Sequence, residues 1–272
     1  MGKVFVFDHA KCNGCRNCQI ACKDEHVDND WSPWAKPQPD TGHFWTHIEE
    51  RVCGQVPKVK VSYLLHICQH CKNAPCIEAA PEAVFRRDDG LVIIDPEKAK
   101  GLKELVEACP YEAIFWNEEL ELPQKCTGCA HLVDAGEVPH CVDVCPHGAL
   151  RFGDEEDFES ELAIAEALVP ERAKTDCPRV HYLNLPKRFL AGLVVDLEAD
   201  EVVIGAKVTA ENVDSGEVLV TETDEFGDFW FHCVPEANWK LYVEAEGYLS
   251  RMLEASTVEE DRNVGPVQVF AS

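Results

Sequence analysis

The sequence predicts two parts: an α+β domain over residues 1–189, followed by an all-β sandwich over residues 190–272. Thirteen of the 15 cysteines come before residue 146. In the same region, short apolar runs are separated by stretches of helical character, a pattern typical of small α+β modules. From Phe189 onward cysteine falls to a single residue, and runs that alternate apolar with polar residues take over. Such alternation favours half-buried strands, so the second part is expected to contain little helix.

The chain is strongly acidic, with 50 Asp and Glu against 25 Lys and Arg, a formal net charge of −25. A surface of this sign repels phosphate groups, which argues against DNA, RNA or an anionic membrane as the main partner. The first eight residues lack the apolar core of a secretory signal, and no run approaches the roughly 18 apolar residues of a membrane span. We therefore expect a cytoplasmic protein without direct membrane insertion, with export on a partner's signal left open.

The cysteines before residue 146 are mostly grouped. The groups are Cys12, Cys15, Cys18 and Cys22; Cys68, Cys71 and Cys76; Cys109 alone; and Cys126, Cys129, Cys141 and Cys145. Three thiolates at such short intervals on one loop can bind three irons of a cubane cluster, while a fourth reaches a second cluster. The last group alone could bind zinc, but the first has no zinc-like spacing. The spacing thus predicts [4Fe–4S] clusters.

The residues around these cysteines carry a resemblance. The motifs are Cys12-Asn13-Gly14-Cys15-Arg16-Asn17-Cys18, Cys68-Gln69-His70-Cys71, Cys109-Pro110-Tyr111, Cys126-Thr127-Gly128-Cys129 and Cys145-Pro146-His147-Gly148. Up to about residue 189, the chain resembles the four-cluster iron–sulfur subunits of the dimethyl sulfoxide reductase family of molybdenum enzymes. The resemblance implies a crosswise pairing of motifs. The implied sets are Cys12, Cys15, Cys18 and Cys145; Cys126, Cys129, Cys141 and Cys22; and Cys68, Cys71, Cys76 and Cys109.

The fourth cluster of that family has no cysteines here. Counting back from Cys109 by the spacing of the motif places the missing ligands at Leu105, Leu102 and Ala99, and the fourth at Ala80. All four are apolar, whereas the other three sets remain complete. We therefore expect three [4Fe–4S] clusters and a small hydrophobic core in place of the fourth. The apolar residues at three-residue spacing also predict a helix over residues 98–108.

The rest of the first domain fits a pair of ferredoxin-like α+β modules. Apolar runs at 91–94, 113–116 and 149–152 predict strands. Residues 23–67 form an insertion rich in tryptophan and proline, which either contacts a partner or shields the clusters from water. Residues 151–189 are expected to wrap the domain.

The second domain is predicted to be an immunoglobulin-like sandwich. Turns at 214–216 and 224–227 separate short alternating strands. The segments Gly205–Thr209 and Ala245–Tyr248 resemble the carboxypeptidase regulatory and collagen-adhesin modules, whose matching residues are turn and core. Nothing in this part predicts a catalytic site.

Three cysteines and two histidines remain outside these assignments. Cys53, Cys177 and Cys233 do not lie at a ligand-motif spacing from any other cysteine, and we interpret them as small buried hydrophobic residues. His70 and His131 lie inside cluster motifs, where they could donate hydrogen bonds to sulfur, line an interface or serve a structural role.

The sequence favours an electron-transfer subunit without a catalytic site of its own. The resemblance implies a large catalytic partner with molybdenum and a molybdopterin guanine dinucleotide cofactor. A lost cluster together with a β-sandwich tail resembles the small subunit of a transhydroxylase, which moves hydroxyl groups between polyphenols without net redox change. The alternatives are the electron-transfer subunit of a respiratory thiosulfate, polysulfide or formate enzyme, and a scaffold protein whose working part is the sandwich.

Overall fold

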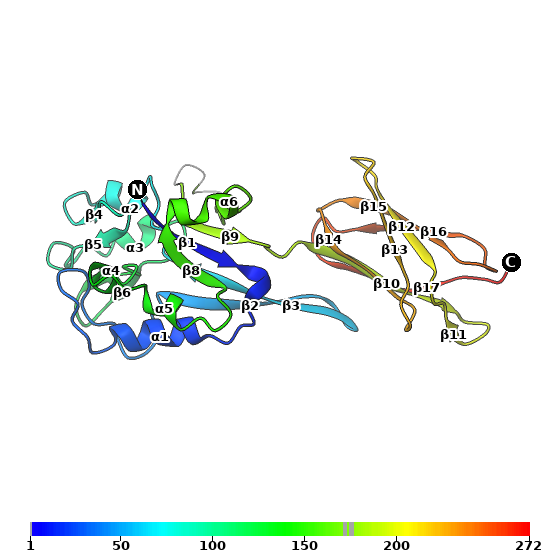
Figure 1. Ribbon diagram of the computed structural model, residues 1–272, viewed down its shortest axis with the longest axis horizontal. Helices are drawn as coiled ribbons and strands as arrows, with labels where there is room; N and C mark the ends of the chain where they lie inside the picture. Colours follow the sequence, from blue (N-terminus) through cyan, green and yellow to red (C-terminus); the bar gives the residue numbers. More distant parts are fainter. Residues whose placement is uncertain (1, 171–172, 174–176) are drawn as a thin grey trace. The chain divides into compact units, whose positions relative to one another are not determined.

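The computed structural model describes residues 2–170, 173 and 177–272, and the chain divides into two compact units (Figure 1). Unit 1 comprises the chain up to Glu50 together with Tyr63–Leu185. Unit 2 comprises Arg51–Ser62 and Pro186–Ser272. A piece of the predicted insertion therefore belongs to the same compact unit as the C-terminal strands.

The central sheet of unit 1 has three strands, and the first residues of the chain form its middle strand. Strand β1 (Lys3–Asp8) pairs antiparallel with β8 (Leu150–Asp154) and parallel with β9 (Val180–Leu183). Val4, Phe5, Val6 and Phe7 are each at most 1% exposed, because the side chains of this strand are covered on both faces. An uninterrupted apolar run is the pattern expected of such a strand.

Short hairpins and helices complete unit 1. The hairpin strands are β4 (Val84–Arg86) and β5 (Val92–Ile94), and β6 (Phe115–Asn117) and β7 (Leu122–Gln124). The helices are α1 (Asn17–His26), α2 (Pro75–Ala79), α3 (Leu105–Ala108), α4 (Ala130–Asp134), α5 (His140–Asp143) and α6 (Glu159–Leu162), with 3-10 turns η1 (His9–Lys11) and η2 (Glu155–Phe158). In the part of the chain that the structure describes, no helix is long and apolar enough to cross a membrane.

The insertion at residues 23–67 contains a long hairpin, β2 (Thr46–Gln55) and β3 (Lys58–Ile67). Its aromatic residues face inward: Trp45 is 2% exposed and Trp31 packs against the same core. Within unit 1 the tryptophans thus fit the shielding role more readily than the partner contact.

The predicted helix over residues 98–108 is wrong in extent, because only its last four residues, Leu105–Ala108, are helical. Gly101 adopts a left-handed conformation with φ of +84°. Its N–H donates to the carbonyl oxygen of Glu121 at 2.8 Å, not to a carbonyl four residues earlier. A succession of turns therefore replaces the first part of the helix, although Ala99 and Leu105 are fully buried as predicted.

Unit 2 is a β-sandwich of two four-stranded sheets. One contains β10 (Arg188–Asp196), β11 (Glu201–Val202), β14 (Asp228–Val234) and β17 (Arg262–Gln268). The other contains β12 (Lys207–Asn212), β13 (Val218–Glu222), β15 (Asn238–Glu244) and β16 (Arg251–Ser256). Alternate residues of these strands form a separate core in which Phe229 and Trp239 are at most 1% exposed. The unit therefore has the hydrophobic interior of an independent domain.

Candidate metal centres

One cavity of unit 1 is lined by four cysteines. Cys68 follows β3, Cys76 belongs to α2 and Cys109 lies at the C-terminal end of α3, while Cys71 occupies the loop between β3 and α2. All four line the same cavity. The pKa of the Cys76 thiol is raised to about 11, chiefly by burial; the charges of Cys68 and Cys109 add to the rise, and that of Lys125 opposes it. Segments about 30 residues apart in sequence thus supply one set of thiols.

A second set lies at the start of α1. The pKa of Cys18 is raised to about 12, chiefly by burial and also by the charges of Cys12, Cys145 and Cys15. Cys15 is exposed and the other three are partly buried. The loop that carries Cys12 and Cys15 turns at a glycine, Gly14, whose φ is +72°. A β-carbon at that position would lie 2.4 Å from the ring of Tyr63, so the close packing requires glycine.

A third set is buried throughout. Cys22 in α1, Cys126, Cys129 before α4 and Cys141 in α5 are between 3% and 5% exposed. Burial raises the pKa of Cys141 well above its ordinary value, and the charges of Cys129, Cys22 and Cys126 add to the effect. These four thiols therefore lie together in a region that water hardly reaches.

The chemistry of the three sets fits iron–sulfur clusters. Each set supplies four thiols, and thiolate is the usual protein ligand of a [4Fe–4S] cluster. Cys145 lies close to Cys12 and Cys18 instead of completing a zinc site with the other cysteines of its motif. Among the described residues, no group of three or more His, Cys, Asp or Glu side chains could hold a single metal ion.

Comparisons with known proteins agree with this geometry. Residues 59–155 match the 4Fe-4S dicluster domain family, and residues 190–269 match the carboxypeptidase regulatory-like domain family. The small subunit of pyrogallol hydroxytransferase from Pelobacter acidigallici is 37% identical over 95% of each chain. The chain belongs to the iron–sulfur subunits of the dimethyl sulfoxide reductase family. Two further members of that family are less similar over a smaller part of the chain.

These two relatives are components of reductases by name. A tetrathionate reductase component of Salmonella typhimurium is 32% identical over 70% of this chain and 76% of its own. A putative dimethyl sulfoxide reductase iron–sulfur component of Halobacterium salinarum is 32% identical over 78% and 92%. This iron–sulfur subunit is thus a component of an oxidoreductase complex and carries [4Fe–4S] clusters, and its second domain is a β-sandwich.

The four positions expected to have lost their cysteines lie together in the iron–sulfur subunit. Ala99 and Leu105 are buried in a hydrophobic cluster beside Cys71, Cys76 and Cys109, and Ala80 and Leu102 pack against it. This cluster also takes in residues of β4, β5 and β7. Apolar side chains therefore occupy the region where the family motif would place thiolates.

Two polar side chains of the first cavity are almost completely buried: Lys125, which the sequence did not single out, and His70, whose role it left open. Lys125 is 3% exposed, and burial alone would lower the pKa of its ammonium, but Cys68, Cys76 and Cys126 raise it above its ordinary value. His70 is 2% exposed, and burial lowers its pKa well below the ordinary value. No sequence motif marks a lysine that precedes a cysteine as a neighbour of cluster ligands. Only the fold shows that Lys125 lies among the thiols.

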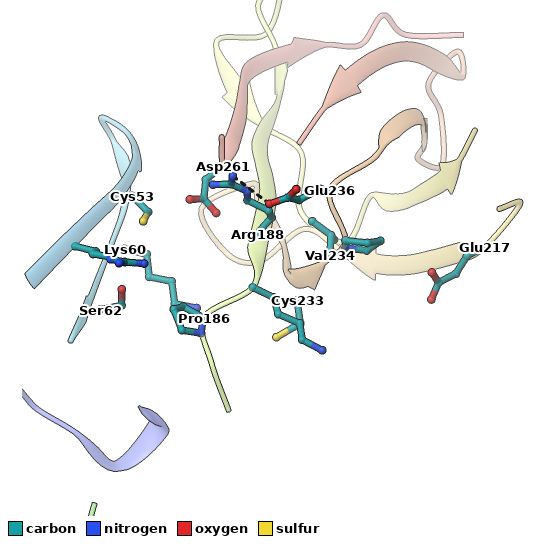
Figure 2. Close-up of a pocket in the computed structure, with 13 residues that line it drawn as sticks. Cys53, Lys60, Ser62, Pro186, Arg188, Glu217, Cys233, Val234, Glu236 and Asp261 are labelled. Carbon is teal, nitrogen blue, oxygen red and sulfur yellow. Dashed lines mark hydrogen bonds and ion pairs between the residues drawn. The ribbon is translucent and has the colours of Figure 1, made fainter. Parts of the chain in front are cut away.

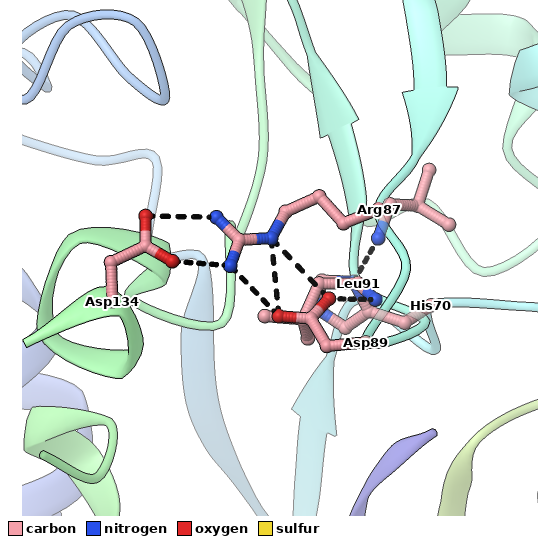
Figure 3. Close-up of polar contacts among 6 residues, drawn as sticks. His70, Arg87, Asp89, Leu91 and Asp134 are labelled. Atoms are coloured by element: carbon pink, nitrogen blue, oxygen red, sulfur yellow. Dashed lines mark hydrogen bonds and ion pairs between the residues drawn. The ribbon is translucent and has the colours of Figure 1, made fainter. Parts of the chain in front are cut away.

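The loop that follows β4 is fixed to α4 by an arginine. Arg87 donates to both carboxylate oxygens of Asp134 and also pairs with Asp89 (Figure 3). Its guanidinium lies 4.5 Å from the ring centre of Trp34. Cys129 is the N-cap residue of helix α4, so this network holds a cluster motif against the hairpin and the insertion.

His131 has a structural partner. Its Nε2 lies 2.9 Å from a carboxylate oxygen of Glu25, and His140 lies at the same distance from the other oxygen. The His131 ring also stacks on Trp31 with their centroids 4.0 Å apart. These contacts join α1, α4 and α5 and favour the structural interpretation of His131.

The expectation that the three remaining cysteines are buried is wrong for Cys177 and Cys233, which are exposed, while Cys53 is partly buried. Cys233 faces outward because the pairing of β14 with β10 shifts register between Arg188 and Leu190. Cys177 adopts a left-handed conformation with φ of +49° in a loop. Cys53 and Cys233 both line an open pocket of unit 2 (Figure 2).

Proposed function

We propose that the chain binds three [4Fe–4S] clusters and no fourth. The proposed ligands are Cys12, Cys15, Cys18 and Cys145 for cluster 1; Cys126, Cys129, Cys141 and Cys22 for cluster 2; and Cys68, Cys71, Cys76 and Cys109 for cluster 3. The observation that carries the proposal is the grouping of twelve cysteines into three sets of four, beside an apolar cluster at the positions of the missing set. Each bound cluster supplies a site that gains and releases one electron at a time.

The residues of this chain hold and shield these sites. Four thiolates complete the protein ligation of each cluster, so no iron is left open to a substrate. Burial of the cluster 2 ligands excludes water, whereas exposed Cys15 brings cluster 1 to the surface of unit 1. Electron transfer without chemistry of its own is the role that this arrangement supports, with catalysis supplied by another chain.

We further propose that the partner is a large catalytic subunit with molybdenum and a molybdopterin guanine dinucleotide cofactor, and that the complex is a cytoplasmic pyrogallol–phloroglucinol transhydroxylase. The similarity to the hydroxytransferase small subunit extends over 95% of the chain and hence into the sandwich. The match to the tetrathionate reductase component covers 70%. A respiratory reductase is the second candidate, because the iron–sulfur domain is shared with those relatives.

Purification of the tagged chain from its native cells under anaerobic conditions tests this proposal. We expect a large subunit that contains molybdopterin to copurify from the cytoplasmic fraction, and the complex to convert pyrogallol to phloroglucinol without an added electron acceptor. A membrane anchor in the complex, together with reduction of tetrathionate by a reduced dye, would support the respiratory candidate instead. Recovery of the chain without any catalytic subunit would overturn both.

A further inference from the structure

The cavity that contains Cys68, Cys71, Cys76 and Cys109 is not lined by apolar side chains alone. Lys125 and His70 also line it, and both are almost completely buried. A buried ammonium is costly unless nearby groups compensate its charge and hydrogen bonds satisfy it. The presence of both groups beside four candidate ligands therefore requires an explanation.

Lys125 is held between two of the candidate cluster sites. Its Nζ donates to the carbonyl oxygen of Val92 and, at 3.1 Å, to that of Cys126. The ammonium also makes a hydrogen bond to Cys68. An ammonium has three N–H donors. The two carbonyl groups fix the position of the ammonium, and its remaining N–H donates to Cys68, a proposed ligand of cluster 3. Because Cys126 is a proposed ligand of cluster 2, Lys125 contacts both sites.

The hydrogen bonds of His70 determine which ring nitrogen carries the proton. Its Nδ1 accepts a hydrogen bond from the N–H of Val92 at 3.0 Å (Figure 3). A neutral imidazole whose Nδ1 accepts must carry its hydrogen on Nε2. The buried Nε2 has no hydrogen-bond partner among the described residues. His70 therefore presents an unused N–H donor in the wall of a cavity that contains four thiols.

We propose that Lys125 and His70 are positioning residues that raise the reduction potential of cluster 3, Lys125 through its buried positive charge and His70 through an N–H···S hydrogen bond. The inference rests on the proposed function, because it assumes a cluster on Cys68, Cys71, Cys76 and Cys109. One electron taken up from a reductant changes the charge of the cluster and its four thiolates from about −2 to about −3. A cation and an N–H donor stabilise the more negative form, and no proton is taken up.

A redox titration of the purified protein followed by electron paramagnetic resonance (EPR) tests the role of Lys125. In Lys125→Met the equilibrium constant for reduction of one cluster should fall about tenfold, a shift of about 59 mV to lower potential. Lys125→Arg retains the charge and should recover most of the potential. The matched control is Lys103→Met, whose exposed ammonium pairs with Glu118. Solvent screens a charge at that position, so the potentials should not change.

His70 is tested by a spectroscopic property that a purely structural residue would not affect. In protein labelled with [¹⁵N]histidine, the reduced cluster 3 should show a hyperfine coupling to one histidine nitrogen. The coupling should disappear in His70→Phe, which preserves a ring against Phe5. A coupling that persists in this variant would overturn the assignment of the donor.

Iron analysis separates failure of this inference from failure of the proposed function. Wild type and Lys125→Met should each contain about 12 irons per chain. Unchanged potentials in a Lys125→Met protein with full iron would overturn the role of Lys125 and leave the cluster assignment intact. If the wild type itself lacked cluster 3 and contained about 8 irons, the proposed function would fail. If Lys125→Met loses iron, the Lys125→Arg protein provides the test instead. A tenfold or larger change in its equilibrium constant for reduction of cluster 3, relative to the wild type, would contradict the proposal.

Discussion

Individual cysteines of unit 1 differ sharply in their surroundings. The proposed ligands of cluster 2 are all buried, whereas Cys15 of cluster 1 is exposed. A buried thiol in apolar surroundings is a poor nucleophile, since burial disfavours the thiolate. Iron reverses this balance because a metal ion deprotonates the thiol that binds it. The buried cysteines should therefore resist alkylation for as long as they bind their clusters.

Replacement of a single ligand should remove one cluster only. In Cys109→Ser we expect cluster 3 to be lost and the iron content to fall from about 12 to about 8 per chain, because the other two sets share no ligand with it. The matched control is Cys233→Ser, which changes an exposed cysteine of unit 2. Iron analysis and EPR provide the measurement. Full iron in Cys109→Ser, or loss of iron in the control, would contradict the ligand assignment.

The sequence could predict candidate ligands one residue at a time, but not all of their neighbours. Cysteine spacing indicated the motifs because loop ligation depends on short separations along the chain. Lys125 was missed because its contacts with Val92 and Cys68 cross long separations that leave no local pattern. Cys233 was misjudged because a register shift between two strands turns it outward, and such a shift has no clear trace in the sequence.

At the level of elements, strands were predicted more accurately than helices. The runs at 91–94 and 149–152 contain β5 and most of the apolar part of β8. The predicted helix was wrong over residues 98–104, because apolar residues at three-residue spacing also suit successive turns around a buried centre. The three-residue spacing of the apolar residues did predict correctly which side chains are buried, since Leu105 and Ala99 are 0% exposed.

The hydrophobic cluster around α3 should contribute to the stability of unit 1. Leu105→Ala removes a fully buried side chain and should cost about 2–5 kcal/mol through lost burial and the cavity left behind. Hydrogen exchange of peptides that cover β4 and β5 would measure the loss. Ile164→Ala is the control, since that side chain is 75% exposed and its loss should have little effect. Equal protection in the two variants would contradict a packed core at this position.

The tip of the β2–β3 hairpin is attached within unit 2 by a buried ion pair. Lys58 pairs with Asp228 on β14, and its ammonium lies 5.2 Å from the ring centre of Trp230. Asp228→Asn would leave the Lys58 ammonium buried without its counter-charge, so we expect a loss of about 3 kcal/mol in the stability of unit 2. Hydrogen exchange of peptides from β14 would measure it.

The control for the hairpin variant is an exposed pair of the same sandwich. Lys207 and Glu244 lie 3.9 Å apart with both side chains more than half exposed. Glu244→Gln should change the stability by less than about 1 kcal/mol, because solvent weakens such pairs. If both variants lost equal stability, the ion pair of Lys58 would have no special role in holding the hairpin tip.

At the scale of the whole chain, the two units differ in what stabilises them. Unit 1 has short helices and a core that includes most of the proposed cluster ligands, whereas unit 2 has a core of apolar strand residues without any of them. Removal of the clusters should therefore unfold much of unit 1 and leave unit 2 folded, since metal binding and folding are coupled. Hydrogen exchange of the full chain before and after chelation would show protection lost in β1 and retained in β15. Simultaneous loss in both strands would contradict independent stability of the sandwich.

The number of clusters is the central claim. Its most direct measurement is the iron and acid-labile sulfide content of the anaerobically purified chain, together with Mössbauer spectra that identify the cluster type. We predict about 12 irons and about 12 sulfides per chain, all in [4Fe–4S] clusters. About 16 irons would contradict the loss of the fourth cluster, and about 8 would contradict the assignment of one of the three cysteine sets.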